Sequence, residues 1–192
     1  IRSIAVSGTN IYAGTSISST FNGGVFLSTN NGSSWTAVNY GLTNQNVHAL
    51  GVAASGVFAG TLSGGIFLSG DNGTSWSSVG ITVQTVYALA ESGTNIFAGT
   101  TAGVYLSANN GISWTCVKSQ LSVTALTVSG TNIFAGTTAG VYLSTNNGAN
   151  WIQTALNNQW IRAFAVSGTN IFAGSNSNGI YLSTNNGTSW NA

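Results

Sequence analysis

The chain has 192 residues, of which only 3% are charged, and its formal net charge is +1. It therefore lacks the basic surface that neutralises phosphates, and nucleic acid is not an expected partner. Hydrophobic residues make up 43% of the chain, but Gly, Ser and Asn interrupt them every few positions. No stretch approaches the roughly 20 apolar residues of a membrane helix, so we expect no membrane insertion.

One repeat organises the whole chain. Five copies of a phrase close to SGTNIFAGT and then GVYLSTNNGTSW each end in a Trp, and successive Trp residues are 41, 38, 37 and 39 positions apart. This spacing is typical of a four-stranded propeller blade, which takes roughly 40 to 50 residues. We predict an all-β fold, a five-bladed β-propeller of four-stranded antiparallel blades, in a single domain over residues 1–192. The blades cover approximately residues 1–40, 41–80, 81–118, 119–156 and 157–192.

The strands follow the same order in every blade. The first strand is predicted at positions such as 47–52 and 161–166, the second at 11–14 and the third at 25–28. The fourth begins at the closing Trp, as at 35–38. Each segment has the length of a strand. Glycine and β-branched residues are dense and no apolar period near 3.6 persists, so essentially no helix is expected.

The joint between the third and fourth strands carries the most specific motif. Ser69, Asp71, Gly73 and Trp76 match the pattern SxDxGxxW, which resembles the Asp-box, or BNR, repeat of sialidases and other secreted propellers. The resemblance covers all five blades, although Asn replaces the acid in four; its carbonyl oxygen still accepts hydrogen bonds from turn N–H groups. The resemblance implies a structural role, with each Trp wedged between blades. The residues assigned to it are Asn30, Gly32, Trp35, Asp71, Gly73, Trp76, Asn109, Gly111, Trp114, Asn146, Gly148, Trp151, Asn185, Gly187 and Trp190.

Closure of the ring is expected to rest on packing between blades 1 and 5. The repeat boundary falls between the fourth strand of one blade and the first strand of the next, so no strand is exchanged between the termini. The last strand stops at Trp190, Asn191 and Ala192. Blade 5 is therefore expected to be the weak edge of the ring.

The two ends of the propeller are expected to differ. The first-to-second and third-to-fourth turns share one end, which repeats nearly verbatim. The second-to-third and fourth-to-first loops share the other, the variable end, where lengths range from 15–24 in blade 1 to 137–140 in blade 4. The second residue of the first strand lies at the variable end and reads Arg2, His48, Tyr87, Thr124 and Arg162 in the five blades. The candidate ligand-binding residues there are Arg2, Tyr40, His48, Tyr87, Lys118, Gln159, Trp160 and Arg162.

This set favours a neutral or anionic ligand. Trp160 and Tyr87 offer flat rings, and Arg2 and Arg162 offer fixed donors. Carbohydrate fits the combination, and the polar surface is similar to that of propeller lectins, in which each blade contributes an equivalent sugar site. Divergence at the second position counts against five equal sites here. We therefore predict a binding module with lectin-like carbohydrate recognition at the variable end.

Catalysis is not expected. Sialidases use an arginine triad, whereas this chain has two arginines in total. Glycoside hydrolysis needs two carboxylates roughly 5 to 9.5 Å apart, but Asp71 is assigned to a turn and Glu91 lies beside another turn at the constant end. His48 is the only imidazole, with no spare Asp to orient it. One His and one Cys cannot form a metal cluster, so neither a metal nor a cofactor is predicted.

Two other function classes stay open. One is a structural or protein-docking scaffold, because propellers of related repeats are similar to photosystem assembly factors and bacterial surface proteins. The other is a designed or reconstructed symmetric propeller with no evolved ligand. A docking surface would show an apolar or charged patch of several hundred Å², whereas this rim is polar. The resemblance to secreted propellers implies an extracellular location or a cell or virion surface, and we expect a monomer.

Overall fold

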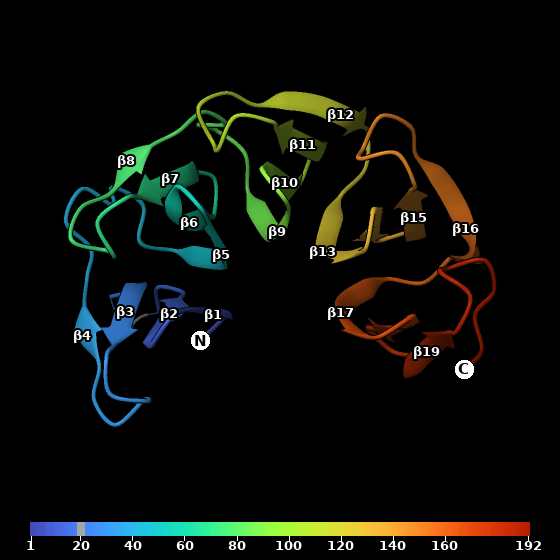
Figure 1. Cartoon of the computed structure of the whole chain (residues 1–192), viewed down its shortest axis with the longest axis horizontal. Helices are drawn as coiled ribbons and strands as arrows, with labels where there is room; N and C mark the ends of the chain where they lie inside the picture. The colour runs from blue at the N-terminus through green and yellow to red at the C-terminus, as the bar shows by residue number, and fades with distance from the viewer. Residues whose placement is uncertain (19–21) are drawn as a thin grey trace.

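The computed structural model describes residues 1–18 and 22–192, so the loop predicted over 15–24 is described in part. The described part contains strands and no helix. Its strands form five antiparallel sheets that follow one another in chain order around a common centre (Figure 1). The prediction of an all-β, five-bladed propeller is confirmed. Blade 5 has three described strands, and its fourth is reduced to a bridge between Leu182 and Asn191.

Each blade places its first strand nearest the centre and its last strand at the rim (Figure 1). The first strands are β1 (Ser3–Ser7), β5 (Val47–Ala53), β9 (Val86–Ser92), β13 (Val123–Ser129) and β17 (Ile161–Ser167). The second are β2 (Asn10–Thr15), β6 (Gly56–Thr61), β10 (Asn95–Thr100), β14 (Asn132–Thr137) and β18 (Asn170–Ser175). The third are β3 (Gly24–Ser28), β7 (Gly65–Ser69), β11 (Gly103–Ser107), β15 (Gly140–Ser144) and β19 (Ile180–Ser183). The fourth are β4 (Thr36–Ala37), β8 (Ser77–Ser78), β12 (Thr115–Ser119) and β16 (Ile152–Asn157).

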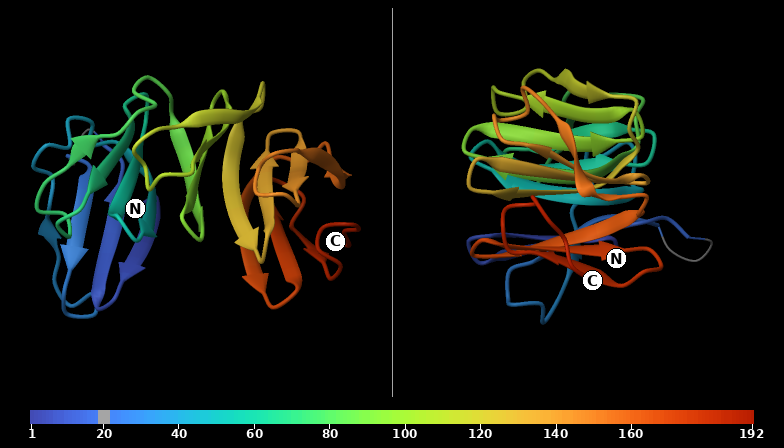
Figure 2. Two further views of the ribbon diagram at one scale, coloured as in Figure 1. Left: turned by 45° about the horizontal axis from the view of Figure 1, so that its top comes forward. Right: turned by 90° about the vertical axis from the view of Figure 1, so that its right-hand side faces the viewer.

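The core lies between the blades. In the right-hand view of Figure 2 the sheets are stacked face to face, so an inner blade is covered on both sides. This explains why the second strands carry compact residues on both parities rather than an alternating pattern. Every residue of β10 from Ile96 to Thr100 is buried. The free energy of folding therefore comes largely from contacts between blades rather than within them.

The turn between the third and fourth strands is closed by the same hydrogen bonds in each blade. In blade 2, Ser69 Oγ donates to Asp71 Oδ1 (2.7 Å) and accepts from the N–H of Gly73 (2.7 Å). Asp71 Oδ1 also accepts from the N–H of Ser75 (2.8 Å). In blade 1 the amide oxygen of Asn30 takes the place of the carboxylate, and the other three blades repeat this arrangement. An amide thus replaces the acid without loss of the turn.

The closing Trp of a blade packs against the blade before it. Trp76 is only 4% exposed, and its Nε1 donates to the carbonyl of Val38 in blade 1 (2.7 Å). Trp114, Trp151 and Trp190 join hydrophobic clusters shared with blades 2, 3 and 4. These four indoles therefore lie between blades, where the motif places them.

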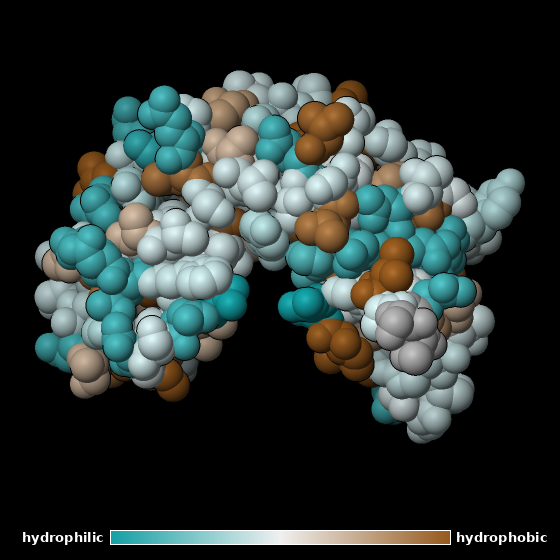
Figure 3. Space-filling view, turned by 180° about the vertical axis from the view of Figure 1, so that it is seen from behind, coloured by the Kyte–Doolittle hydropathy of each residue, from teal (hydrophilic) through white to brown (hydrophobic). Residues whose placement is uncertain are grey.

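The blades form an open arc. Successive first strands pack together from β1 to β17, but β17 does not return to β1 (Figure 1). Figure 3 shows the opening from behind. The expectation that blades 1 and 5 close the ring is wrong, because the rotation set by each interface leaves five blades short of a full turn. The expected placement of Trp35 between blades is wrong for the same reason: in the open arc this side of blade 1 has no neighbouring blade, and Trp35 is 40% exposed.

Replacing Trp76 tests the contribution of these indoles to stability. Trp76→Ala should lower the free energy of unfolding by about 3 to 5 kcal/mol, because it leaves a cavity between blades 1 and 2. Trp35→Ala is the matched control at the same position of the repeat, and it should cost only about 1 kcal/mol, as is usual for a partly exposed site. Urea denaturation of both variants measures the difference. Equal losses would contradict the packing described above.

Candidate functional site

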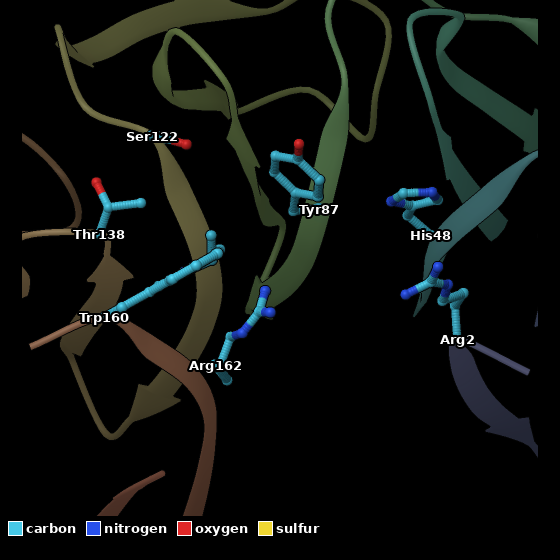
Figure 4. A pocket seen from close by; sticks show the side chains of 8 residues that line it. Arg2, His48, Tyr87, Ser122, Thr138, Trp160 and Arg162 are labelled. Atoms are coloured by element: carbon cyan, nitrogen blue, oxygen red, sulfur yellow. The ribbon is translucent and has the colours of Figure 1, made fainter. Parts of the chain in front are cut away.

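One cavity occupies the centre of the variable end. Its volume is about 400 Å³, and the repeat position of Arg2 and His48 lines it in all five blades. Figure 4 shows the lining side chains. The lining residues are Arg2, His48, Tyr87, Ser122, Thr124, Thr138, Trp160 and Arg162. Thr138 belongs to a second-to-third loop and Trp160 to a fourth-to-first loop, so both loop types share this end, as expected. We call this space the axial cavity.

A β-bulge turns the second residue toward the axis. In blade 2, Val47 pairs with Thr61 and Ala49 pairs with Gly60, which leaves His48 without a partner on β6. The first strands of blades 3, 4 and 5 are irregular at the same point. The residue before the bulge is fully buried between blades in each of these four cases. A bulge re-aims a side chain at a strand end, so the burial of the first residue directs the second into the cavity.

Two guanidinium groups enter the axial cavity from the two end blades (Figure 4). Arg2 Nε donates to Ser16 Oγ (2.8 Å), and Arg162 Nε donates to Asn176 Oδ1 (3.0 Å). In both cases the acceptor lies in the second-to-third loop of the same blade, and the hydrogen bond fixes the plane of the guanidinium. Arg162 Cζ also lies 3.9 Å from the centroid of the Trp160 ring, a cation–π contact. The donors are therefore held in place before any ligand arrives.

His48 lines the axial cavity beside Arg2, and Tyr87 lines it in the next blade (Figure 4). Their ring centroids are 5.7 Å apart, with the planes inclined by 40°. Burial lowers the pKa of His48 below its usual value of 6.5, and the charge of Arg2 lowers it further. The imidazole is therefore neutral at pH 7 and offers one donor and one acceptor. The lining includes no carboxylate, so the two arginines give the axial cavity its positive charge.

The axial cavity brings together five of the eight predicted ligand-binding residues, and three lie elsewhere. Tyr40 is 79% exposed at the junction of blades 1 and 2, where its carbonyl accepts from the N–H of Trp76. Lys118 lies on the rim strand β12, with Nζ 5.3 Å from the centroid of the Tyr142 ring. Gln159 accepts a hydrogen bond from Asn178 (2.6 Å) and does not line the axial cavity. Of the predicted residues outside the first-strand position, only Trp160 reaches the axial cavity.

Three lining residues were not among the predicted ones. Thr124 occupies the same repeat position as His48 and Tyr87, which is the signal that could have selected it. Its hydroxyl donates to the carbonyl of Ile161 in the next blade. Ser122 precedes β13, and Thr138 lies in the short loop of blade 4. No sequence signal distinguishes these two residues from the many other Ser and Thr residues of the repeat.

The two acids lie outside the axial cavity. Hydrogen bonds from Ser75, first from its side chain and then from its backbone, lower the pKa of Asp71 to about 2. Glu91 lies deeper along the first strands, beside Leu89 and Val52. Burial raises the pKa of Glu91, and its Oε1 has no hydrogen-bond partner among the described residues. Neither carboxylate is placed to act on a ligand in the axial cavity.

The described part of the chain has neither a metal-ligating cluster nor a membrane-spanning helix. Residues 1–18 and 22–192 hold no cluster of three or more His, Cys, Asp or Glu side chains that could bind a metal ion. Over the same ranges, no helix has the length and apolar character needed to cross a bilayer.

No protein-family model matches the chain, and no curated protein matches it. Solved structures are similar. An ancestral GH74 enzyme superposes with a TM-score of 0.79 at 22% identity, over 99% of this chain and 30% of that one. The GH74 xyloglucanase from Xanthomonas campestris gives 0.71 at 16%, over 94% and 35%. YCF48, solved bound to D1 peptide, gives 0.67 at 14%, over 98% and 65%. The chain spans less than two thirds of each, and the likeness shows the propeller fold alone.

The buried Glu91 should give stability a distinct pH dependence. Its pKa is higher in the folded state than in the unfolded state, so the folded state binds more protons between the two values. Stability therefore falls as the pH rises above the usual Glu value of 4.5. Glu91→Gln should raise the melting temperature at pH 7 and bring no gain below pH 4.5. A variant that melts below the parent at pH 7 would contradict the burial of this carboxyl.

Proposed function

We propose that this chain is a non-catalytic binding module whose axial cavity holds an acidic saccharide. The observation that carries the proposal is the approach of Arg2 and Arg162 to one cavity whose lining has no carboxylate. Arginine binds carboxylate and sulfate groups through paired N–H donors. An unpaired positive charge on both sides of a cavity favours a ligand that brings its own negative charge.

The remaining lining suits the neutral part of a sugar. The cavity volume of about 400 Å³ lies within the roughly 300 to 1,000 Å³ of small-molecule sites. His48 and Tyr87 supply exchangeable donors and acceptors for hydroxyl groups. Trp160 lines the axial cavity and is 39% exposed, so its ring offers apolar surface to a pyranose. One site at the axis replaces the five equal sites of a lectin-like ring.

Three further assignments belong to this proposal. The third-to-fourth turns are of the Asp-box type, which their shared hydrogen bonds support. The absence of catalysis is supported by the positions of Asp71 and Glu91, outside the axial cavity. The GH74 structures are enzymes on a similar fold, and a shared fold does not transfer an activity. An extracellular location accords with binding of a polysaccharide.

Calorimetric titration with trigalacturonic acid and with neutral cellotriose tests the site. The acidic trisaccharide should bind and the neutral one should not. Arg162→Gln should weaken binding roughly tenfold or more, since it removes a charge-assisted contact. Lys118→Gln is the matched control, because it removes the same charge at the rim and should leave affinity unchanged. Binding should also weaken with added salt, as exposed guanidinium groups are screened.

The alternatives give different results in the same titration. Equal binding of both trisaccharides, unaffected by Arg162→Gln, would exclude the axial cavity as the site. Binding of a short acidic peptide in place of either saccharide would favour the docking scaffold. The similar YCF48 structure, solved bound to D1 peptide, is the reason to include a peptide. No binding of any of the three would support a propeller without an evolved ligand.

A further inference from the structure

One contact repeats at all four interfaces between blades. In blades 1 to 4 the second strand contains a Gly without space for a methyl group, because the first residue of the next blade fills that space. A Cβ at Gly60 would lie 2.6 Å from Val86 Cγ1, and one at Gly136 would lie 2.7 Å from Ile161 Cγ2. Gly14 and Gly99 receive Val47 and Val123 in the same way. All four incoming side chains are fully buried. We call this the first-residue contact.

A second contact repeats with the same direction. The aromatic residue of each second strand packs against the turn Gly of the next blade. A Cβ at Gly111 would lie 2.5 Å from Phe58 Cε1, and one at Gly187 would lie 2.6 Å from Phe134 Cε1. Phe97 faces Gly148 in the turn of blade 4, and Tyr12 lies against Gly73 in the turn of blade 2 at a looser 3.6 Å. All four rings are fully buried. We call this the aromatic–glycine contact.

The two end faces of the arc hold the unmatched halves of both contacts. Ile1 is the first residue of blade 1 and is 82% exposed, whereas its four equivalents are fully buried. Among the described residues, the turn glycine of blade 1, Gly32, meets only Trp35 of its own turn. At the other end, Gly174 has no neighbour from another blade in the described part of the chain. Phe172 beside it is only partly buried and lines a shallow hollow on the outer face of blade 5.

We propose that the two end faces are docking surfaces for a further stretch of the same repeat. Its first blade would place a Val or Ile against Gly174 and a turn Gly against Phe172. Its last blade would offer a second-strand Gly to Ile1 and an aromatic ring to Gly32. The stretch would convert the arc into a closed ring. This inference is independent of the ligand in the axial cavity.

Continuity with the existing interfaces supports this occupant. Each end face is one half of an interface that the chain already forms four times. The face of blade 5 is the half that receives a following blade, and the face of blade 1 is the half that packs on a preceding blade. Ile4 is 61% exposed on the face of blade 1, whereas its equivalent Leu50 is 8% exposed in blade 2. A second whole copy is disfavoured, because five blades already occupy more than half of the circle (Figure 1) and five more do not fit the opening.

The test appends a second copy of residues 79–156 directly after Ala192. Trp190 and Ala192 correspond in the repeat to Trp76 and Ser78, so the extension continues in register. It supplies Val86 and Gly111 at its start, and Phe134 and Gly136 at its end, which are the partners that the end faces lack. The extended chain should melt at a higher temperature than the 192-residue chain, and its Trp35 should be less quenched by acrylamide.

Two substitutions show whether the end faces are engaged. Gly174→Ala fits the 192-residue chain, because the nearest atom to the new methyl group is 3.8 Å away, and Ile1→Ser changes an exposed side chain. Both should leave its melting temperature unchanged. In the extended chain each should lower the melting temperature by roughly 5 °C or more. Gly136→Ala should destabilise both chains, since Ile161 already fills that space.

Other results would overturn the proposal. If neither substitution lowers the melting temperature of the extended chain, added repeats do not dock on these faces. The same holds if acrylamide quenches Trp35 equally in the extended and the 192-residue chain. Sedimentation velocity on the 192-residue chain covers the remaining case. If that chain self-associates, and Ile1→Ser or Gly174→Ala abolishes the association, the occupant is a second copy rather than a further stretch of repeat.

Discussion

The structure depends on an aliphatic side chain entering the space above a glycine of the preceding blade. With few charges and an abundance of neutral polar residues, the chain has little else to hold sheets together, and each sheet buries its apolar residues only against its neighbours. Val86 over Gly60 and Ile161 over Gly136 bring the backbones close and fix how far each blade rotates from the last. Repetition of one such step produces an arc.

The same step explains why a site forms at the axis. Burial of the first residue of each inner strand aligns these strands at one height and directs the following residue toward the centre through a bulge. Side chains as different as His48, Tyr87 and Arg162 then share one cavity although they lie in three different blades. The scaffold thus keeps its interfaces nearly constant while the second position is free to vary, which is how a repeat protein can acquire a single site.

Much of this could be predicted from sequence, because the signals are local. The repeat period predicted the blades, and turn residues such as Asn30 and Gly32 predicted the hairpins. Four of the predicted residues that line the axial cavity were selected through their shared repeat position, and the fifth, Trp160, through the loop that leads into β17. Closure could not be predicted, since it depends on the angle between blades, which no residue pattern encodes directly. That Tyr40, Lys118 and Gln159 do not line the axial cavity could not be predicted, because loop length alone does not show whether a side chain reaches the axis. The bulge that turns His48 toward the axis could not be predicted from the sequence either.

Hydrogen exchange followed by mass spectrometry tests the central claim, that stability resides in contacts between blades. If it does, amide protection depends on how many neighbours a blade has rather than on its own strands. The account predicts the slowest exchange in β6, β10 and β14, and faster exchange in β2 and β18, although the five strands carry nearly the same sequence. Equal protection of all five second strands, or greatest protection in blades 1 and 5, would contradict it.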